Sequence, residues 1–286
     1  MSQIPQVSVI VPTFQEAGNL SLLVPRIGAA LDKAALTYEV LVVDDDSQDG
    51  TSVVCKKLAR EFPLRLLTRV GQRGLATAVI HGLNAAAADR LVVMDADLSH
   101  PPESIAELVR ALDSPAVDFV IGSRYVPGGQ VDAGWTGFRR LNSGVATLLA
   151  RGLTRARDPM AGFFALPKST YTRAGTLRPL GYKIGLELMV RCNCQHLREV
   201  PITFLDRTHG KSKMDLGQQW LYLRHLGRLY LAKFTLGVQA LFEPRQRKTQ
   251  IPPLAQSGMG SVPPTGQSAP VGPSAHGTRE PGHRAA

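Results

Sequence analysis

The stretch "LVVDDDSQDG" at residues 41–50 and the similar stretch "LVVMDADLSH" at residues 91–100 each lead from an apolar run directly into clustered aspartates. Carboxylates close to one another and to a protein core repel and lose hydration, unless a cation or hydrogen-bond donors compensate. We therefore expect something positive or rich in donors beside the end of each run.

Around these stretches, short runs of Val, Ile and Leu alternate with helix-like patterns from residue 7 to about residue 123. Such runs are typical of strands buried on both faces, and repeated strand, helix, strand units form parallel sheets covered by helices. The expected strands are residues 7–11, 39–43, 64–68, 91–94 and 119–121, and the expected helices are residues 19–31, 51–61, 75–88 and 103–112. Ligands of such sheets bind outside the carboxyl ends of the strands, where both aspartate clusters are expected.

The second half is less regular, and its expected elements are a helix at 138–153, a strand at 162–166, a helix at 184–196 and extended chain at 198–204. The segment 216–242 is largely apolar but carries basic residues, and its uncharged stretches are far shorter than the roughly 20 residues that span a bilayer. We expect it to lie on a membrane or to pack on the core, and not to cross.

The composition beyond residue 242 turns to Pro, Gly, Ser, Gln and basic residues, which is typical of a disordered tail. The predicted organisation is one domain at 1–242, with a first half at about 7–124 and a second half at about 125–242, followed by the tail at 243–286. Residues 1–6 lack the basic and then apolar blocks of a signal peptide.

The charge and the cysteines narrow the class of protein. A chain of 286 residues with 44% hydrophobic residues buries a sizeable core, and its net charge of +10 favours an anionic partner. Three cysteines without paired C-x-x-C motifs indicate neither a disulfide framework nor a zinc site, and fit a reducing cytoplasm. Two nucleotide motifs are excluded, because no G-x-G-x-x-G follows the first strand and Leu205 replaces the first Gly that a P-loop at 210–212 requires.

The second cluster suits a metal ion. If the chain leaves the sheet in extended form, Asp95 and Asp97 project to the same side, because side chains alternate along a strand. Two carboxylates there form a ligand pair for a hard divalent cation, Mg²⁺ or Mn²⁺. Taken alone, the pair fits equally well the capping of a turn before Pro101 and Pro102.

The first cluster offers more acceptors than a helix cap needs. Asp49 and Thr51 suit capping of the next helix, but Asp44, Asp45 and Asp46 exceed that requirement. They suit a nucleoside, whose base and ribose hydroxyls need acceptors, while a metal at the second cluster holds the diphosphate.

Seven stretches in order carry a resemblance to a known family: "VIVPTFQEAGNL", "VVDDDSQDGT", "RGLATAVIHGL", "VVMDADLSHPP", "VIGSRYVPGG", "DPMAGFFA" and "RTHGKSKM". Together they resemble the family 2 glycosyltransferases with a GT-A fold, over about residues 7–234. Within that family they are most similar to the mannosyltransferases that use dolichyl or polyprenyl phosphate. The resemblance implies a mostly parallel α/β sheet flanked by helices, and transfer of mannose from GDP-mannose to a lipid phosphate. It also implies that the first half, at about 7–124, binds the nucleotide sugar, and that the second half, at about 125–242, is the acceptor half.

The resemblance also implies a donor site. Asp95 would contact both the nucleotide and the metal, Asp97 would bind the metal, and Ser99 stands where such transferases usually carry a Gln ligand. The residues that would line the nucleotide-sugar pocket are Pro12, Phe14, Glu16, Asp44, Asp46, Asp95 and Asp97.

Basic residues form the predicted acceptor site. The planar fork of Arg suits phosphate oxygens, although a lone Arg fits a solvated surface equally well. Arg139 and Ser143 share a helix face at i and i+4. Within the matched stretches, the predicted acceptor phosphate-binding residues are Arg124, Arg139, Ser143, Arg207 and Lys213, and the predicted catalytic residues are Asp97, Arg124, Arg139 and Arg207.

A phosphate acceptor sets the expected mechanism. A phosphate monoester, with its second pKa near roughly 6, is already an anion at neutral pH and needs orientation more than a base. We expect direct displacement with inversion, by a peripheral enzyme at the cytoplasmic membrane face that acts alone or with a small membrane-anchoring subunit. Nucleic acid is not expected as a partner. The alternatives are a glucose-type transferase that uses UDP-sugars, and a family 2 transferase that acts on a saccharide hydroxyl.

Overall fold

The structure, a computed structural model, describes residues 4–132, 137–177, 180–181, 183–205 and 216–242, with the backbone alone at 137–143, 216–219 and 237–242. Met1–Glu243 make one compact unit. The predicted tail lies outside the described residues, so its disorder stays a prediction.

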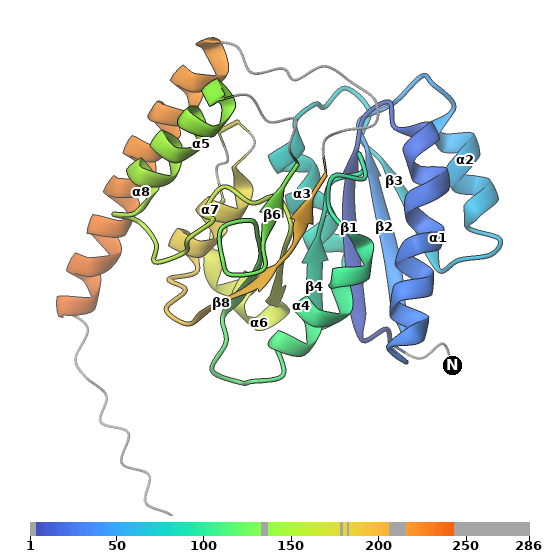
Figure 1. Cartoon of the computed structure of the whole chain (residues 1–286), viewed down its shortest axis with the longest axis horizontal. Coiled ribbons are helices and arrows are strands. Elements are labelled where there is room, and N and C mark those ends of the chain that lie inside the picture. Colours follow the sequence, from blue (N-terminus) through green and yellow to red (C-terminus); the bar gives the residue numbers. More distant parts are fainter. Residues whose placement is uncertain (1–3, 133–136, 178–179, 182, 206–215, 243–286) are drawn as a thin grey trace, which may run out of the picture. The chain divides into compact units, whose positions relative to one another are not determined.

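The centre of the fold is a seven-stranded sheet with the order β3-β2-β1-β4-β7-β5-β8 (Figure 1). Its strands are β1 (Val7–Thr13), β2 (Tyr38–Asp44), β3 (Leu64–Thr68), β4 (Arg90–Val93), β5 (Phe119–Ser123), β7 (Phe164–Pro167) and β8 (Leu197–Pro201). Only β7 runs antiparallel to its neighbours, β4 and β5, while the other neighbouring pairs are parallel. The mostly parallel α/β sheet expected from the sequence is confirmed.

Helices cover both faces of this sheet (Figure 1). One face packs against α1 (Ala17–Lys33), α2 (Thr51–Leu58) and α4 (Ile105–Ala111). The other packs against α3 (Leu75–Ala85), α5 (Gly137–Ala150), α7 (Ile184–Arg191) and α8 (Leu216–Phe242). The short elements are η1 (Pro102–Ser104), α6 (Lys168–Tyr171), η2 (Thr172–Ala174) and a two-stranded sheet of β6 (Gln130–Val131) and β9 (Thr203–Phe204).

The sequence pattern explains the central elements. All seven residues of β1 are buried, as expected for a strand covered on both faces. Along α1, the side chains of Leu20, Leu23, Ile27 and Leu31 recur every three or four residues and are all buried, which is the apolar stripe of a helix that packs on a sheet.

Several helices end earlier than expected, and long-range hydrogen bonds explain one case. The helix expected at 75–88 ends at Ala85, and Ala86 is already extended. The Nζ of Lys168 donates to the carbonyl of Ala86, and the amide of Ala87 donates to the carboxylate of Glu39. Because Lys168 and Glu39 bind the carbonyl of Ala86 and the amide of Ala87, these backbone groups are not used for hydrogen bonds of a further helical turn. The helices expected at 51–61 and 184–196 likewise end at Leu58 and Arg191.

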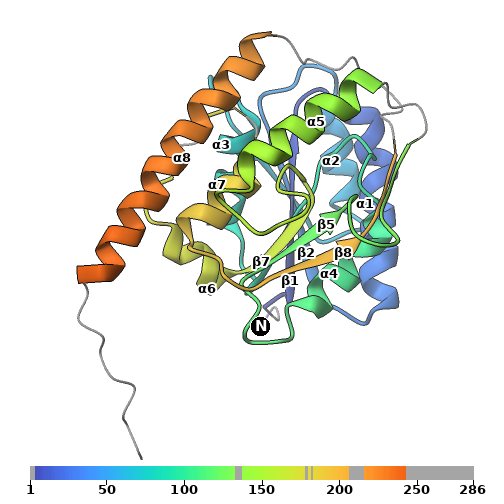
Figure 2. The same cartoon turned by 60° about the vertical axis from the view of Figure 1, so that its left-hand side comes forward.

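Helix α8 lies beside α5 on the outside of the sheet (Figure 2). The hydroxyl of Tyr222 donates to the carbonyl of Ala146 at 2.7 Å, and that of Tyr230 donates to the carbonyl of Leu149 at 2.7 Å. The Nζ of Lys233 donates to the carbonyl of Gly152 at 2.9 Å and so ties α8 to the turn that follows α5. In the described part of the chain, no helix is both long enough and apolar enough to cross a bilayer.

Candidate active site

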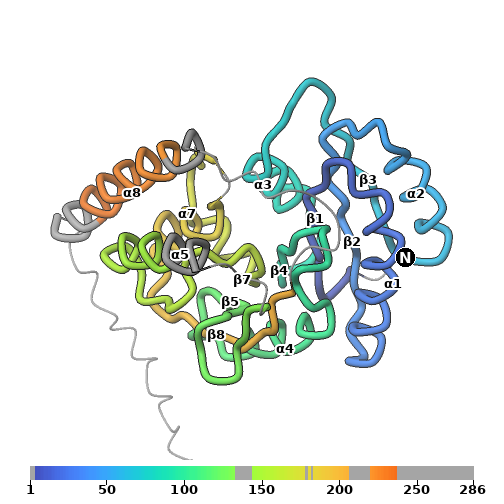
Figure 3. Tube along the Cα trace, turned by 45° about the horizontal axis from the view of Figure 1, so that its top comes forward, coloured from blue at the N-terminus to red at the C-terminus, as the bar shows by residue number. Residues whose placement is uncertain are grey.

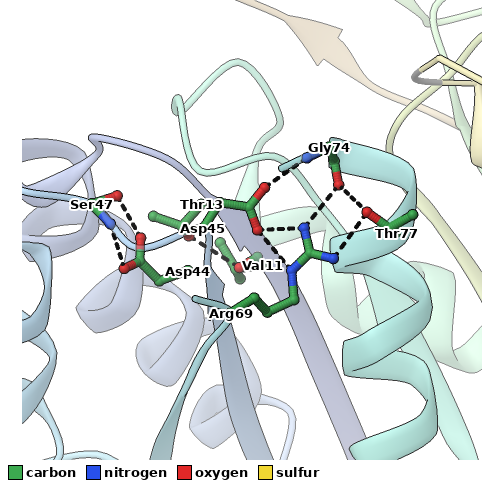
Figure 4. A network of polar contacts seen from close by, with 8 residues as sticks. All are labelled: Val11, Thr13, Asp44, Asp45, Ser47, Arg69, Gly74 and Thr77. Carbon is green, nitrogen blue, oxygen red and sulfur yellow. Dashed lines mark hydrogen bonds and ion pairs between the residues drawn. The ribbon is translucent and has the colours of Figure 1, made fainter. Parts of the chain in front are cut away.

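Asp44 is the last residue of β2 and lies beside Thr13, the last residue of β1. It is buried, and both carboxylate oxygens accept hydrogen bonds from Ser47, from its hydroxyl at 2.5 Å and its amide at 3.0 Å (Figure 4). Ser47 thus fixes the orientation of the carboxylate that the sequence assigned to the nucleotide.

Asp45 has a different role from its neighbours in the cluster. Its buried carboxylate forms an ion pair with Arg69, which follows β3, and accepts the amide of Gly74 at 2.8 Å (Figure 4). Arg69 also donates to the hydroxyl of Thr77 and the carbonyl of Gly74. This network ties the ends of β2 and β3 to the start of α3. Asp45 is therefore a scaffold residue, and the sequence alone does not distinguish it from Asp44 and Asp46.

The loop after β1 faces the loop after β2. The amide of Gln15 donates to the hydroxyl of Ser47 at 2.7 Å, and the amide of Ala17 donates to Asp49 at 3.1 Å. Asp49 also accepts the amide and hydroxyl of Thr51, the first residue of α2. The N-cap residue of this helix is Gly50, however, so neither Asp49 nor Thr51 occupies the cap position that the sequence suggested. Because Asp49 serves the first turns of both α1 and α2, it holds the two loops together.

Three predicted nucleotide-binding residues lie at the end of β1 and in the loop that follows it. Pro12 is buried within β1, whereas Phe14 and Glu16 are half-buried in the loop. The guanidinium of Arg73 stacks over the ring of Phe14 at 4.3 Å. Glu16 accepts a hydrogen bond from the side chain of Asn19 at 2.5 Å. Phe14 and Arg73 thus form a flat, cationic surface, and the sequence had not assigned a role to Arg73.

The second cluster follows β4, which neighbours β1 in the sheet. Asp97 is buried, and its Oδ1 accepts both the hydroxyl of Ser99 at 2.6 Å and the amide of Ser99 at 3.1 Å. Asp95 is more open, with a side chain 26% exposed. The strand order β2-β1-β4 brings Asp44 and the Asp95/Asp97 pair to one edge of the sheet, as expected from the sequence.

Backbone strain marks the same edge. Five of the described residues other than glycine have left-handed backbones, and three of them lie here: Gln15 with φ 60°, Asp46 with φ 57° and Leu98 with φ 61°. Each follows the end of a neighbouring strand, β1, β2 or β4. Such backbones cost on the order of 1 kcal/mol or more each, and their clustering is typical of functional sites. The sequence does not predict left-handed backbones at these positions, and at Leu98 it argues against one, because Leu rarely adopts this conformation.

His100 binds the backbone of Asp95, a role that the sequence does not reveal. The buried ring lies 5.3 Å from the ring of Phe163 and 5.5 Å from that of Phe204. Its Nδ1 accepts the amide of Asp95 at 3.1 Å. Burial lowers the pKa of His100, so the ring is neutral at pH 7 and carries its proton on Nε2. A Cβ on Gly162 would lie 3.2 Å from Asp95, so this glycine allows the close approach.

Arg124 forms a buried ion pair with Asp158. Its Nε and Nη2 each donate to the carboxylate at 2.8 Å, and its amide donates to the same group at 3.0 Å. Burial acts to lower the pKa of Arg124, but the hydrogen bond and charge of Asp158 outweigh it and raise that pKa. Asp158 therefore fixes one edge of the guanidinium, a partner that the sequence analysis did not identify.

Lys183 is a basic residue of the site that was not assigned from the sequence. Its Nζ donates to the carbonyl of Met160 at 3.2 Å. Burial, helped by the charge of Arg124, lowers the pKa of Lys183 to about 8, while Asp158 and Asp95 oppose that shift. The ammonium group therefore interacts electrostatically with the predicted acceptor residue Arg124, with its partner Asp158 and with the predicted metal ligand Asp95.

Four predicted acceptor residues are not tested by this geometry. Arg207 and Lys213 lie outside the described residues, and for Arg139 and Ser143 only the backbone, on α5, is described. Their roles stay predictions. Within the described ranges, no group of three or more His, Cys, Asp or Glu side chains is placed to hold a metal ion. The Asp95/Asp97 pair would therefore supply two ligands and depend on the substrate or water for the others.

The chain is similar to known proteins in both sequence and fold. The model of Glycosyl transferase family 2 matches residues 8–172 of the 286. The chain is 42% identical over 228 residues to a Dolichol-phosphate mannosyltransferase of Pyrococcus furiosus, with 78% of this chain and 63% of the relative covered. It thus spans less than two thirds of that relative. A Dolichol-phosphate mannosyltransferase of Mycosarcoma maydis is 39% identical over 241 residues, with 82% of each chain covered.

Solved structures support the fold. Mannosyl-3-phosphoglycerate synthase from Rubrobacter xylanophilus has a TM-score of 0.61 at 20% identity, covering 86% of this chain and 78% of that one. Glucosyl-3-phosphoglycerate synthase from Mycobacterium tuberculosis, solved with Mn²⁺ and UDP, has a TM-score of 0.57 at 18% identity, with 80% of each chain covered. Since the family model spans more than half of its residues, and relatives are 39% and 42% identical to it, the chain belongs to glycosyl transferase family 2.

Proposed function

We propose that this glycosyltransferase transfers mannose from GDP-mannose to dolichyl or polyprenyl phosphate at the cytoplasmic face of a membrane. One observation carries the proposal: Asp44 and the Asp95/Asp97 pair follow the two strands, β2 and β4, that flank β1 in the sheet. They do so in a chain 38–42% identical to three proteins named Dolichol-phosphate mannosyltransferase.

The nucleoside would bind over β1 and β2. Asp44 and Asp46 would accept hydrogen bonds from base and ribose, while Pro12 and Glu16 would shape the pocket. Phe14 would offer a flat face, and Arg73, already stacked on it at 4.3 Å, would meet the phosphates. The support is that Ser47 and Asp49 fix these loops before any ligand arrives, so that little ordering free energy is lost on binding.

The donor set suits a hard divalent cation. Asp95 and Asp97 offer carboxylate oxygens, the ligands that Mg²⁺ and Mn²⁺ prefer. Ser99, the third predicted ligand, donates its hydroxyl to Asp97 at 2.6 Å and so orients that carboxylate. A bound Mg²⁺ or Mn²⁺ would supply positive charge for the diphosphate. Lys183 would add a second positive charge to the same group.

The acceptor phosphate would lie against Arg124, Arg139, Ser143, Arg207 and Lys213. Two hydrogen bonds of 2.8 Å to Asp158 fix the side-chain conformation of Arg124, so the guanidinium would bind the phosphate without loss of rotamer freedom. A phosphate oxygen would attack the anomeric carbon while the bond from that carbon to the diphosphate oxygen breaks. GDP would leave with the electron pair from the opposite face, which inverts the anomeric carbon and requires no general base.

Helix α8 would hold the enzyme at the membrane. Its inner side packs on the core through the buried His225, Leu226 and Leu229. Its outer side exposes Trp220 by 68%, Leu231 by 68% and Phe234 by 72%. An exposed apolar face with basic residues beside it is typical of a helix that lies in a membrane interface. The enzyme would act there alone or with a small anchoring subunit.

A donor and acceptor panel tests the proposal. The purified chain is incubated in detergent with Mn²⁺, labelled GDP-mannose or UDP-glucose, and either polyprenyl phosphate or soluble saccharides. We expect label from GDP-mannose to enter the lipid phase only with polyprenyl phosphate. Label from UDP-glucose in the lipid would assign a glucose-type transferase instead, and label in the saccharides would assign a hydroxyl acceptor.

A further inference from the structure

We propose that a hollow at the end of α5 binds the phosphate group of an anionic bilayer lipid, separately from the acceptor. This rests on the proposed action at a membrane. The hollow measures about 840 Å³ and is lined by Leu148, Arg151, Arg155 and Arg157, with Tyr125 and Thr154. We call it the arginine hollow.

The arginine hollow carries an excess of positive charge, because three arginines line it and Glu199 is the one described carboxylate whose recorded partners are backbone amides beside it. Arg151, Arg155 and Arg157 are all exposed, and none has a carboxylate partner among the described residues. The acids nearest in the chain and the sheet are already engaged. Asp158 pairs with Arg124, and Glu199 accepts the amides of Arg157 and Asp158 at 2.9 and 3.0 Å. Three planar guanidinium groups around one hollow suit the oxygens of a phosphate, each through a bidentate contact.

The walls of the arginine hollow are fixed before any ligand arrives. On one side, Glu199 of β8 holds the backbone at 157 and 158. On the other, the Nζ of Lys233 holds the carbonyls of Gly152 and Leu153 at 2.9 and 3.1 Å. A loop anchored at both ends loses little conformational freedom when it binds. The three arginines therefore converge through the fold and do not depend on a mobile chain.

Apolar surface beside the hollow identifies a lipid and not a free phosphate. On α5, Val145, Leu148 and Leu149 are 47%, 62% and 40% exposed, and Leu148 itself lines the hollow. The exposed side of α8 continues this surface, because Tyr230 and Lys233 tie α8 to the end of α5 (Figure 2). A free phosphate would use the arginines alone. A bilayer phospholipid would use both, with its phosphate in the hollow and its acyl chains along the helices.

A matched pair of triple variants tests the site. R151Q/R155Q/R157Q removes three charges from the hollow, whereas K56Q/K57Q/R60Q removes three exposed charges from and just after α2. Figure 3 shows α2 at the opposite end of the fold from α5 and α8. With vesicles containing about a fifth phosphatidylglycerol in phosphatidylcholine, we expect the hollow variant to bind at least about tenfold more weakly than wild type, and the α2 variant less than about twofold. Equal losses in both variants would overturn the proposal.

Soluble probes separate a lipid site from a general attraction for anions. Dihexanoyl phosphatidate below its micelle concentration and inorganic phosphate are titrated into the full chain. We expect the lipid to bind wild type at least about tenfold more tightly than phosphate does, and this preference to vanish in the hollow variant. Equal affinity for the two probes would assign a free-anion site and refute the lipid.

Activity distinguishes this inference from the proposed function. Mannose transfer to polyprenyl phosphate in detergent should be unchanged in R151Q/R155Q/R157Q, because no bilayer is present there. A loss of detergent activity would make the arginine hollow part of the acceptor site and overturn a separate lipid site, while leaving the transferase activity in place. A wild type that binds both lipid probes as expected but transfers no mannose would refute the proposed function alone.

Discussion

The hydroxyl of Ser99 donates a hydrogen bond of 2.6 Å to Asp97 Oδ1, and the amide of the same residue donates to the same oxygen at 3.1 Å. Ser99 lies one residue beyond Leu98, whose left-handed backbone turns the chain back on itself. The turn thus orients the buried carboxylate, and under the proposed function Ser99 would act on a bound metal through Asp97.

Ser99→Ala should weaken metal binding without abolishing turnover. Loss of a hydrogen bond to a metal-binding carboxylate typically costs about 10- to 100-fold in metal affinity. We expect the Mn²⁺ concentration for half-maximal activity to rise by at least about tenfold, with activity recovered at high Mn²⁺. Ser114→Ala, at an exposed position, is the control. An unchanged Mn²⁺ requirement in Ser99→Ala would contradict the orienting role.

Asp45→Asn and Asp46→Asn should separate stability from binding. Asp45 is buried against Arg69, and removing one partner of a buried pair costs about 3–5 kcal/mol of unfolding free energy. Asp46 is half-buried, and its carboxylate accepts a weak hydrogen bond from Gln48 at 3.4 Å, while Gln48 also donates to the main-chain carbonyl of Asp46 at 3.2 Å. We expect its change to leave stability within about 0.5 kcal/mol and to weaken GDP binding by about tenfold. Urea unfolding and GDP titration measure the two effects; the reverse pattern would refute the assignment.

The pKa of Lys183 predicts an alkaline limit to activity. Since that pKa is lowered to about 8, the ammonium charge is present below pH 8 and lost above it. We expect kcat/KM for the nucleotide sugar to fall as pH rises through 8, and Lys183→Arg to move this fall upward. The effect on stability has the opposite sign. Between pH 8 and the ordinary lysine pKa of 10.5, Lys183 is protonated in the unfolded chain but largely neutral in the folded one, so its contribution to the free energy of unfolding increases as pH rises. A profile that is flat from pH 7 to 9 would exclude a role for the charge.

The outer side of α8 should control attachment to bilayers. Trp220→Ser with Phe234→Ser removes two exposed aromatic side chains, and Val53→Ser removes an apolar side chain from α2 that is also 68% exposed. We expect the double variant to lose at least about tenfold in vesicle affinity, and the control to match wild type. Activity in detergent should be retained by both. If vesicle binding survived the double change, another surface would have to hold the membrane.

The sequence predicted the elements that depend on local pattern. The strands that end in the aspartate clusters were found because buried parallel strands read as short Val and Ile runs. Their placement at the carboxyl ends of the strands was expected from the rule that ligands bind there, and in the order β2-β1-β4 a single strand separates the two clusters. Family resemblance, and not physical reasoning, supplied the sugar and the lipid acceptor.

What the sequence could not predict depends on partners far away in the chain. The run at 162–166 gave no sign that β7 is antiparallel, because the direction of a strand is set by its connections. The sequence does not distinguish the three consecutive aspartates, whereas in the structure Asp45 alone of the three pairs with Arg69, 24 residues away. Likewise, Asp158 lies 34 residues from Arg124, and neither residue carries a local signal of the pair.

The most direct test of the account is metal-dependent mannose transfer by Asp97→Asn. Asparagine keeps the shape of Asp97 but removes its charge, so folding and vesicle binding should persist while the cation loses a ligand. We expect Mn²⁺-dependent turnover to fall at least about 100-fold, with unchanged circular dichroism. Turnover at the wild-type level, with the wild-type Mn²⁺ requirement, would contradict a cation held at the end of β4.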